Sequence, residues 1–180
     1  MFFSKKSEFI VQNNWPNYLK YVQYKWVIKL NNKEIMTLGI NEARKTMNEN
    51  KGGPFGAVIT DKNGNVISVA SNLVLETHDP TAHAEVMAIR DASQKLETHD
   101  LSNCTLYATG YPCPMCISAI IWANIKEVYY GTDLNDASKI GFRDDFIKNK
   151  DSNILDIKQI SHEECLELFN EYEKNNKEIY

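Results

Sequence analysis

Two short motifs, His83-x-Glu85 and Pro112-Cys113-x-x-Cys116, constrain the fold of this chain more than any other feature. Each motif stands at the start of a segment with helical character, so its reactive side chains would lie at a helix N-terminus. Unpaired backbone N–H groups and the helix dipole favour thiolates at such a position. The chain must therefore fold so that two helix N-termini meet at one edge of a sheet, which a strand–helix–strand crossover allows.

One imidazole and two thiols make three ligands of the kind that zinc binds. A structural zinc site normally has four protein ligands, whereas a catalytic site has three and one open position. No fourth ligand has a matching place, and three other residues qualify by type alone: His78, His99 and His162. Glu85 need only reach a water at the open position to move its proton. The motifs predict one catalytic Zn²⁺ per chain, held by His83, Cys113 and Cys116.

Three interpretations of these motifs are open. His-x-Glu followed by Pro-Cys-x-x-Cys is typical of zinc deaminases that act on nucleobases. A redox Cys-x-x-Cys normally follows a strand in a thioredoxin-like fold and needs no His-x-Glu. A purely structural zinc site could instead hold together a non-enzymatic interaction protein. Because the histidine, the glutamate and both cysteines occur together, the first interpretation is favoured.

Alternating strand and helix patterns predict an α/β fold. Helices are expected at 34–50, 82–96, 113–123 and 161–174, and strands at 55–60, 66–70, 104–108, 127–130 and 154–160. Segments 71–79 and 133–145 are expected to be loops, and 61–65 is expected to be a hairpin turn with Asn-Gly at its tip. The assembly predicted is a three-layer α/β/α sandwich with a mixed five-stranded sheet.

Two of the expected helices carry predictions about burial. In the helix at 34–50, a core-facing side is expected from four residues: Ile35, Leu38, Ala43 and Met47. The helix at 113–123 is apolar almost all round, which predicts that it is buried on every side.

The bulk composition fits a single soluble domain with one sizeable core. The chain has 180 residues, of which 43% are hydrophobic and 24% are charged. No apolar run approaches the roughly 20 residues of a membrane span. The first residues lack the apolar run of a secretory signal, so a cytoplasmic location is expected. Cys104 and Cys165 stand alone and are expected to be buried, unreactive thiols.

The N-terminal segment, residues 1–33, differs in composition from the rest and is expected to be an aromatic and basic extension of a domain at 34–180. It holds six lysines and one glutamate, a balance of +5. Because the net charge of the whole chain is −4, residues 34–180 have a net charge of −9. Its apolar side chains recur at helical spacing: Trp15, Tyr18, Leu19, Val22, Trp26 and Leu30. Such a helix could dock on the body or on a second subunit, or could contact nucleic acid or a membrane surface. The acidic body repels polyanions, which favours a small substrate over nucleic acid.

Several motifs in residues 34–180 resemble the cytidine/deoxycytidylate deaminase superfamily, and most closely its bacterial-type guanine deaminases. They are Gly52-Gly53-Pro54-Phe55-Gly56-Ala57-Val58, Asn72, Asp79-Pro80-Thr81-Ala82-His83-Ala84-Glu85, Pro112-Cys113-Pro114-Met115-Cys116, Trp122-Ala123, Gly141-Phe142-Arg143-Asp144-Asp145 and the C-terminal tyrosine. The resemblance implies that His83, Cys113 and Cys116 hold zinc and that Glu85 shuttles protons.

The same resemblance implies roles for five further residues. Asn72 would hydrogen-bond the base, and Phe55 and Ala84 would contribute to the substrate pocket. Asp144 would assist proton transfer at the departing amine. Tyr180 would contact the base from a partner subunit, because in that branch the C-terminal segment crosses over and closes the partner's pocket as a lid. A domain-swapped homodimer is therefore expected.

The implied reaction is hydrolytic deamination of a free purine base, guanine to xanthine and ammonia. Deamination of adenosine in transfer RNA, or of another small aminated ring such as cytosine or a triazine, is the alternative.

Two features depart from the resemblance. Tyr111 stands where a glutamate is common, which changes the charge beside the metal site, and residues 1–33 have no counterpart in the compact members.

Overall fold

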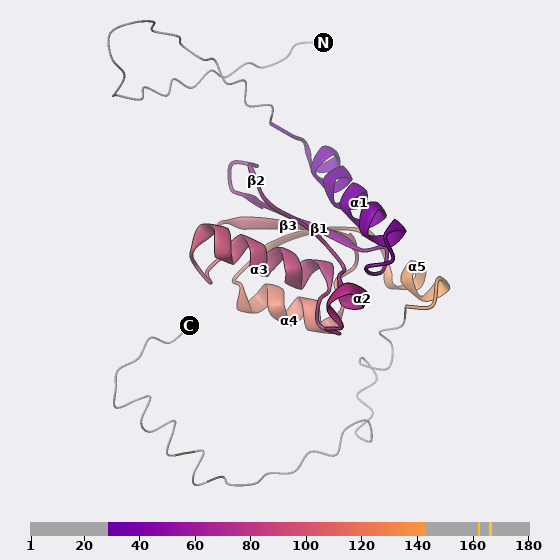
Figure 1. Cartoon of the computed structure of the whole chain (residues 1–180). Coiled ribbons are helices and arrows are strands. Elements are labelled where there is room, and N and C mark those ends of the chain that lie inside the picture. The colour runs from indigo at the N-terminus through magenta and orange to yellow at the C-terminus, as the bar shows by residue number, and fades with distance from the viewer. Residues whose placement is uncertain (1–28, 143–161, 163–165, 167–180) are drawn as a thin grey trace, which may run out of the picture.

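The protein folds as a three-layer sandwich, with α1 on one face of a sheet and α3 and α4 on the other (Figure 1). The computed structural model describes residues 29–142, 162 and 166. Its helices are α1 (Asn32–Asn48), α2 (Val74–Thr77), α3 (Ala84–Leu96), α4 (Pro114–Trp122) and α5 (Leu134–Lys139). Its strands are β1 (Gly56–Asp61), β2 (Val66–Ser71), β3 (Cys104–Gly110) and β4 (Glu127–Thr132). The predicted fold class is confirmed.

The sheet runs in the order β2-β1-β3-β4, with β1 antiparallel to β2 and β3, and β3 parallel to β4. The predicted hairpin is confirmed, and Gly64 at its tip has a φ of +84°. The described part of the sheet has four strands rather than five. The segment expected to supply the fifth, 154–160, lies outside the described residues, as does the expected helix up to residue 28. Within the expected C-terminal helix, the described residues His162 and Leu166 are helical.

Two segments predicted to be loops contain short helices. The segment 71–79 contains α2, and the segment 133–145 begins with α5. α5 starts with a capping box in which Asp133 and Asp136 each accept a hydrogen bond from the other's backbone N–H. Neither helix has a buried residue, so neither produces the apolar periodicity on which the prediction relied.

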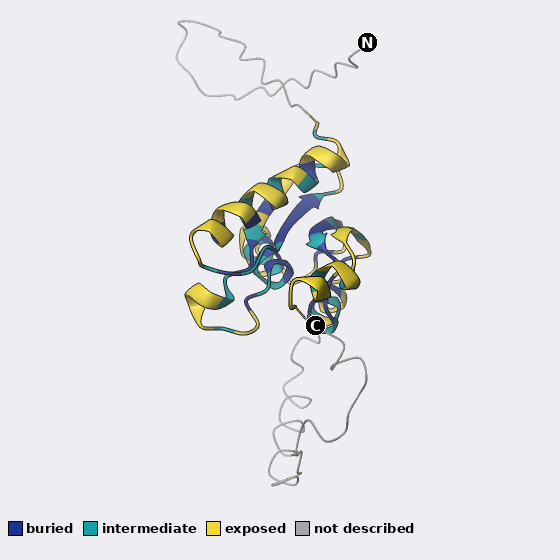
Figure 2. Cartoon of the chain, turned by 90° about the vertical axis from the view of Figure 1, so that its right-hand side faces the viewer, coloured by how far each residue is buried: buried dark blue, intermediate teal, exposed yellow. Residues whose placement is uncertain are grey.

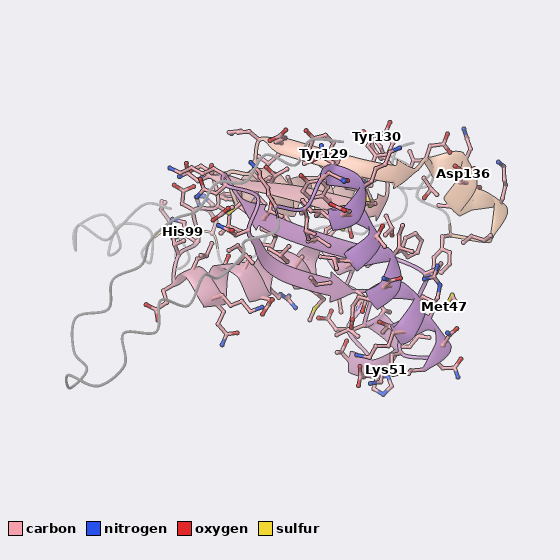
Figure 3. All side chains as sticks on the ribbon, turned by 90° about the horizontal axis from the view of Figure 1, so that it is seen from above. Met47, Lys51, His99, Tyr129, Tyr130 and Asp136 are labelled. Carbon is pink, nitrogen blue, oxygen red and sulfur yellow. The ribbon has the colours of Figure 1, made fainter. Side chains whose placement is uncertain are left out.

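Helix α1 faces the sheet with a narrower and more polar stripe than predicted. A capping box between Asn31 and Glu34 fixes its start, so the expected domain boundary at residue 33 falls within its first turn. Ile35 and Ala43 are buried as predicted, but Met47 is 41% exposed and points away from the sheet (Figure 3). Thr46 takes the buried place instead, because its hydroxyl pairs with that of Ser71 on β2 at 2.5 Å. The predicted position of Met47 was wrong.

Helix α4 is not buried on every side. Cys116 and Ile120 are buried, whereas Ile121 is 63% exposed and Trp122 is 73% exposed. The prediction from its composition was therefore wrong for one face of the helix. No helix in the described part of the chain combines the length and the apolar character that crossing a membrane requires.

The core between the sheet and α3 is built mainly from small side chains. Of twelve buried residues in this cluster, six are alanines: Ala57, Ala84, Ala88, Ala92, Ala108 and Ala123. Figure 2 shows the strands as the buried centre, with the exposed face of α1 turned outward. Small side chains let α3 lie close to β1 and β2, which places the N-terminus of α3 near the end of the sheet.

The approach of α1 to β1 is closer still. A Cβ atom at Gly56 would lie 2.1 Å from the Gly39 carbonyl oxygen and 2.8 Å from its carbonyl carbon. Because these are backbone atoms, they cannot turn aside as a side chain would. Gly56 therefore sets the distance between α1 and β1, the strand that follows Phe55.

We expect Gly56→Ala to lower the free energy of unfolding by about 2–3 kcal/mol, because helix and strand must separate to admit the methyl group. Gly39→Ala is the matched control on the facing turn, where a new Cβ would meet only ordinary contacts, the nearest being Val58 Cγ2 at 3.4 Å. In a helix interior alanine is favoured over glycine by roughly 1 kcal/mol, so this variant should be at least as stable as wild type. Urea unfolding of both variants checks this, and equal stabilities would contradict it.

Candidate active site

His83 and Cys113 occupy equivalent positions at the starts of α3 and α4. Each is the N-cap residue of its helix, with extended backbone at φ −68° and ψ 153° for His83 and φ −67° and ψ 167° for Cys113. Pro114 follows Cys113 at the first helical position, where the missing N–H costs nothing. Cys116 lies one turn into α4 and is completely buried. The two helix N-termini thus present three metal-ligating side chains to one point.

The geometry of these side chains fits a zinc ion. Nδ1 of His83 lies 3.6 Å from Sγ of Cys113 and 3.6 Å from Sγ of Cys116. Ligands at the usual Zn–N and Zn–S distances in a tetrahedral arrangement would be about 3.6 Å apart. All three ligand atoms lie within 4.8 Å of one another, and no fourth residue in the described ranges joins the group. His78, His99 and His162 are exposed and lie outside it. The group can therefore hold one zinc ion and leave a position open.

The two cysteines interact directly, and their pKa values shift in opposite directions. The pKa of Cys113 is lowered to about 4, first by a hydrogen bond with Cys116 and then by interactions with His83, against the effect of burial. The pKa of Cys116 is raised, because it gives this hydrogen bond to Cys113 and because it is buried beside Glu85. Zinc binds the thiolate form of cysteine, so metal binding would release the protons that the two thiols still hold.

Glu85 is a buried carboxyl next to the ligand group. It lies in the first turn of α3 with 8% of its surface exposed. Burial raises its pKa, because the charged form loses its hydration, and the nearby Cys113 thiolate adds to the effect. A carboxyl that keeps its proton more readily than usual is suited to both accepting and donating a proton in one reaction cycle.

Phe55, Asn72, His83, Glu85 and Cys113 meet in one cavity of about 390 Å³. All five residues were predicted for the site from the sequence. Cys116 lies behind this lining, and Ala84 is fully buried in the core between His83 and Glu85. The remaining lining residues are Gly52, Gly53, Val74, Leu75, Pro80, Gly110, Tyr111, Ala137 and Phe142. Asp144 and Tyr180, also predicted for the site, lie outside the described residues.

Asn72 is held in a fixed orientation. Its side-chain oxygen accepts hydrogen bonds from the backbone N–H groups of Gly53 and Val74, both at 3.2 Å. Its own backbone N–H donates to the Phe55 carbonyl at 2.9 Å. The residue is 5% exposed. Because the amide oxygen is engaged, the amide nitrogen is the group that Asn72 can offer to a ligand, as a hydrogen-bond donor.

The wall formed by α2 and α5 was missed from the sequence. Val74 and Leu75 come from α2, and Ala137 and Phe142 come from α5 and the residues after it. The Asp133–Asp136 capping box is a local signal that could have located α5. Tyr111, noted as a departure from the resemblance, lines the cavity and packs edge-to-face on Tyr130 at 5.0 Å. Tyr129 and Tyr130 lie on β4 along the edge of the sheet (Figure 3).

Comparisons with known proteins agree with this site. The sequence model of the cytidine and deoxycytidylate deaminase zinc-binding region matches residues 30–132. Guanine deaminase of Bacillus subtilis is 44% identical over 118 residues, which are 66% of this chain and 75% of that protein. A tRNA-specific adenosine deaminase of Buchnera aphidicola is 35% identical over 130 residues, which are 72% of this chain and 85% of that protein.

The structure as well as the sequence is similar to the Bacillus subtilis guanine deaminase. The X-ray structure of the Bacillus subtilis guanine deaminase superposes with a TM-score of 0.79 at 37% identity, covering 84% of this chain and 99% of that one. The region that the family model matches, residues 30–132, contains the zinc-ligand group and the buried Glu85 carboxyl. This chain therefore belongs to the cytidine and deoxycytidylate deaminase family and is an enzyme of the zinc-dependent deaminase type.

Proposed function

We propose that this enzyme deaminates guanine, with guanine and water giving xanthine and ammonia. The observation that carries the proposal is the meeting of three groups in one cavity of about 390 Å³: the zinc-ligand group, the buried Glu85 carboxyl and the oriented Asn72 amide. A cavity of this size suits a small ring system. The 44% identity to a guanine deaminase supports guanine as that ring.

His83, Cys113 and Cys116 would hold the zinc. When bound, zinc supplies Lewis-acid activation of a water molecule. Glu85 would take a proton from the attacking water and pass it to the ring nitrogen beside the carbon that carries the amine. It would then take the proton of the hydroxyl added to that carbon and give it to the amine, so that the carbonyl forms as the C–N bond breaks and ammonia leaves. The raised pKa of Glu85 favours this role, because the carboxyl holds a proton between the two transfers.

Asn72 suits a base that offers acceptors. Its amide nitrogen is a donor, and guanine carries two acceptors, O6 and N7, along one edge. Adenine keeps N7 but has a donor, N6, in place of O6, so the same edge offers one acceptor fewer. The Asn72 oxygen is already engaged by Gly53 and Val74, so it is poorly placed to accept a hydrogen bond from N6.

Four further residues complete the proposed site. Phe55 and the backbone near Ala84 would hold the base against the cavity wall. Asp144 would assist at the departing amine, and Tyr180 of a partner chain would close the cavity. These roles rest on the resemblance of the motifs, and the position of Phe55 in the cavity supports its part.

A homodimer is part of the proposal. The exposed apolar face of α4, with Ile121 at 63% and Trp122 at 73% exposure, supports a subunit interface there. This helix also carries the ligand Cys116, so an interface on its outer face would lie close to the metal site. Such an arrangement would allow the C-terminal segment of one chain to reach the cavity of the other.

Deamination of adenosine in transfer RNA is the second candidate. The 35% identity to a tRNA-specific adenosine deaminase, covering 85% of that protein, favours it. The balance of +5 in residues 1–33 could supply phosphate contacts. The charge of −9 carried by residues 34–180 weighs against it, because an acidic surface repels a polyanion.

We expect Glu85→Gln to keep its zinc and lose about 10²–10⁴-fold in turnover, because glutamine fills the same space and cannot transfer protons. Cys113→Ala is the contrasting variant and should lose zinc as well as activity, because a ligand is gone. Metal content by mass spectrometry and ammonia release on each protein separate the two effects. Normal turnover by Glu85→Gln would refute the assigned role.

Ammonia release from guanine, adenine, cytosine, their nucleosides and aminotriazines should be fastest with guanine. Asn72→Ala should lower kcat/KM for guanine by about 10–100-fold, because a buried hydrogen bond to the base is lost. Asn63→Ala, on the exposed hairpin, is the matched control and should behave as wild type.

A transfer-RNA substrate belongs in the same panel, with and without residues 1–28. This deletion leaves the Asn31 capping box of α1 intact. Adenosine deamination in the transfer RNA that depends on residues 1–28, without turnover of guanine, would favour the second candidate.

We expect Trp122→Glu to shift the protein from dimer to monomer in analytical ultracentrifugation, because a charge would be placed in the proposed interface. Val66→Glu, another exposed apolar residue but on the hairpin, should remain dimeric. A wild-type protein that sediments as a monomer at every concentration would exclude the interface.

A further inference from the structure

The segment 134–142, which comprises α5 and the residues after it, forms one wall of the catalytic cavity with little burial of its own. Ala137 and Phe142 line that cavity. Yet α5 has no buried residue, Ile140 is 61% exposed and Phe142 is 44% exposed. Figure 3 shows α5, marked by Asp136, at the opposite end of the molecule from His99. Such a wall keeps its place only if specific contacts hold it.

The Phe142 ring makes the contact that joins this segment to the body. It packs edge-to-face on Phe55, with ring centroids 4.9 Å apart and an interplanar angle of 89°. The Phe142 backbone N–H donates to the Ala137 carbonyl at 3.1 Å, so the chain folds back on α5 at this point. Aromatic pairs in this geometry attract one another beyond the effect of buried area.

Both rings pack against the backbone of Gly53. A Cβ atom at Gly53 would lie 3.0 Å from Cζ of Phe142 and 3.2 Å from Cδ2 and Cε2 of Phe55. Any larger residue would have to push one ring away. The backbone N–H of Gly53 also donates to the side-chain oxygen of Asn72. The two rings therefore pack directly beside Asn72, the residue proposed to contact the base.

Phe55 is held by the body of the protein. It is partly buried and packs against the core cluster, and a Cβ atom at Gly110 would lie 3.4 Å from its ring. α5 has no buried residue, and a second cavity of about 440 Å³, which lies between α1 and α5, shares Phe55 and Ala137 with the catalytic cavity. The held Phe55 ring can therefore anchor Phe142, and Phe142 in turn can hold α5.

We propose that Phe142 is a positioning residue, whose ring, seated on Gly53 and Phe55, holds α5 in place as the wall of the substrate cavity. This inference rests on the proposed function for its substrate. Phe142 acts through Phe55 and Ala137, and the chemistry stays with Glu85 and the ligand group.

The test combines steady-state kinetics with hydrogen exchange on the zinc-loaded full chain. Phe142→Ala should raise KM for guanine about tenfold with a smaller change in kcat, because binding is weakened while the proton-transfer group is untouched. Amide exchange across residues 134–142 should become faster in the substrate-free protein. Phe142→Tyr keeps the ring edge and should restore both values. Ile140→Ala removes a similar apolar group from the same segment outside the catalytic cavity, and should leave KM within about twofold of wild type.

Each result bears on the proposal. An unchanged KM in Phe142→Ala overturns it, as does a raised KM without faster exchange in 134–142, since the ring would then serve only as a direct contact for the substrate. If Phe142→Ala fails to fold, Gly53→Ala crowds the same contact with both rings present and should give the same rise in KM and exchange. Hydrogen exchange needs no substrate, so it still tests the anchoring role if wild type releases no ammonia from guanine.

Discussion

The meeting of two helix N-termini is the constraint on which the rest of this structure depends. Zinc-ligand atoms must lie about 3.6 Å apart, whereas His83 and Cys113 are separated by a helix, a strand and two connections. β3 leads directly to Cys113, and the parallel crossover to β4 returns the chain along the same sheet. On the other side, the alanines of α3 bring that helix against β1 and β2. The packing of the helices on the sheet therefore brings the ligand atoms of the two motifs together.

The polar groups of the cavity are oriented before any ligand arrives. Asn72 is fixed by two backbone N–H groups, and Glu85 is fixed by its place in the first turn of α3. Gly52 belongs to the same arrangement, because a Cβ there would fall 1.9 Å from the Asn72 carbonyl oxygen. A site with its donors already in place spends little binding energy on ordering itself.

The parts of the site that could be predicted from the sequence are those defined by local patterns. His83, Glu85, Cys113 and Cys116 were predictable because their spacing and the helix starts beside them lie within a few residues. Cys104 is buried as predicted, and its burial raises the pKa of its thiol, whereas Cys165 lies outside the described residues. The domain division at residue 33 stays a prediction.

The failures share a cause in contacts between distant parts of the chain. Thr46 displaced Met47 from the core side of α1 because Ser71, on another element, offers its hydroxyl a partner. The apolar character of α4 gave no indication that one face would stay uncovered. Phe142 belongs to a motif of the resemblance, but its ring contact could not be predicted, because the partner, Phe55, lies 87 positions earlier in the chain. Apolar periodicity indicates which residues of a segment could be buried. Contacts with other segments determine which of these residues are buried in the fold.

The alanine-rich core has a consequence for how this protein can change. In a core of large side chains, most damage comes from removing atoms and leaving a cavity. Here half of the cluster between the sheet and α3 offers almost nothing to remove. Added volume is the danger instead, because a larger residue at Ala84, Ala88 or Ala92 would lift α3 from the sheet. His83 and Glu85 lie at the start of α3, so a substitution that moves α3 would also move both of these residues. The close packing of α3 on the sheet therefore limits which mutations the core tolerates and also fixes the geometry of the metal site.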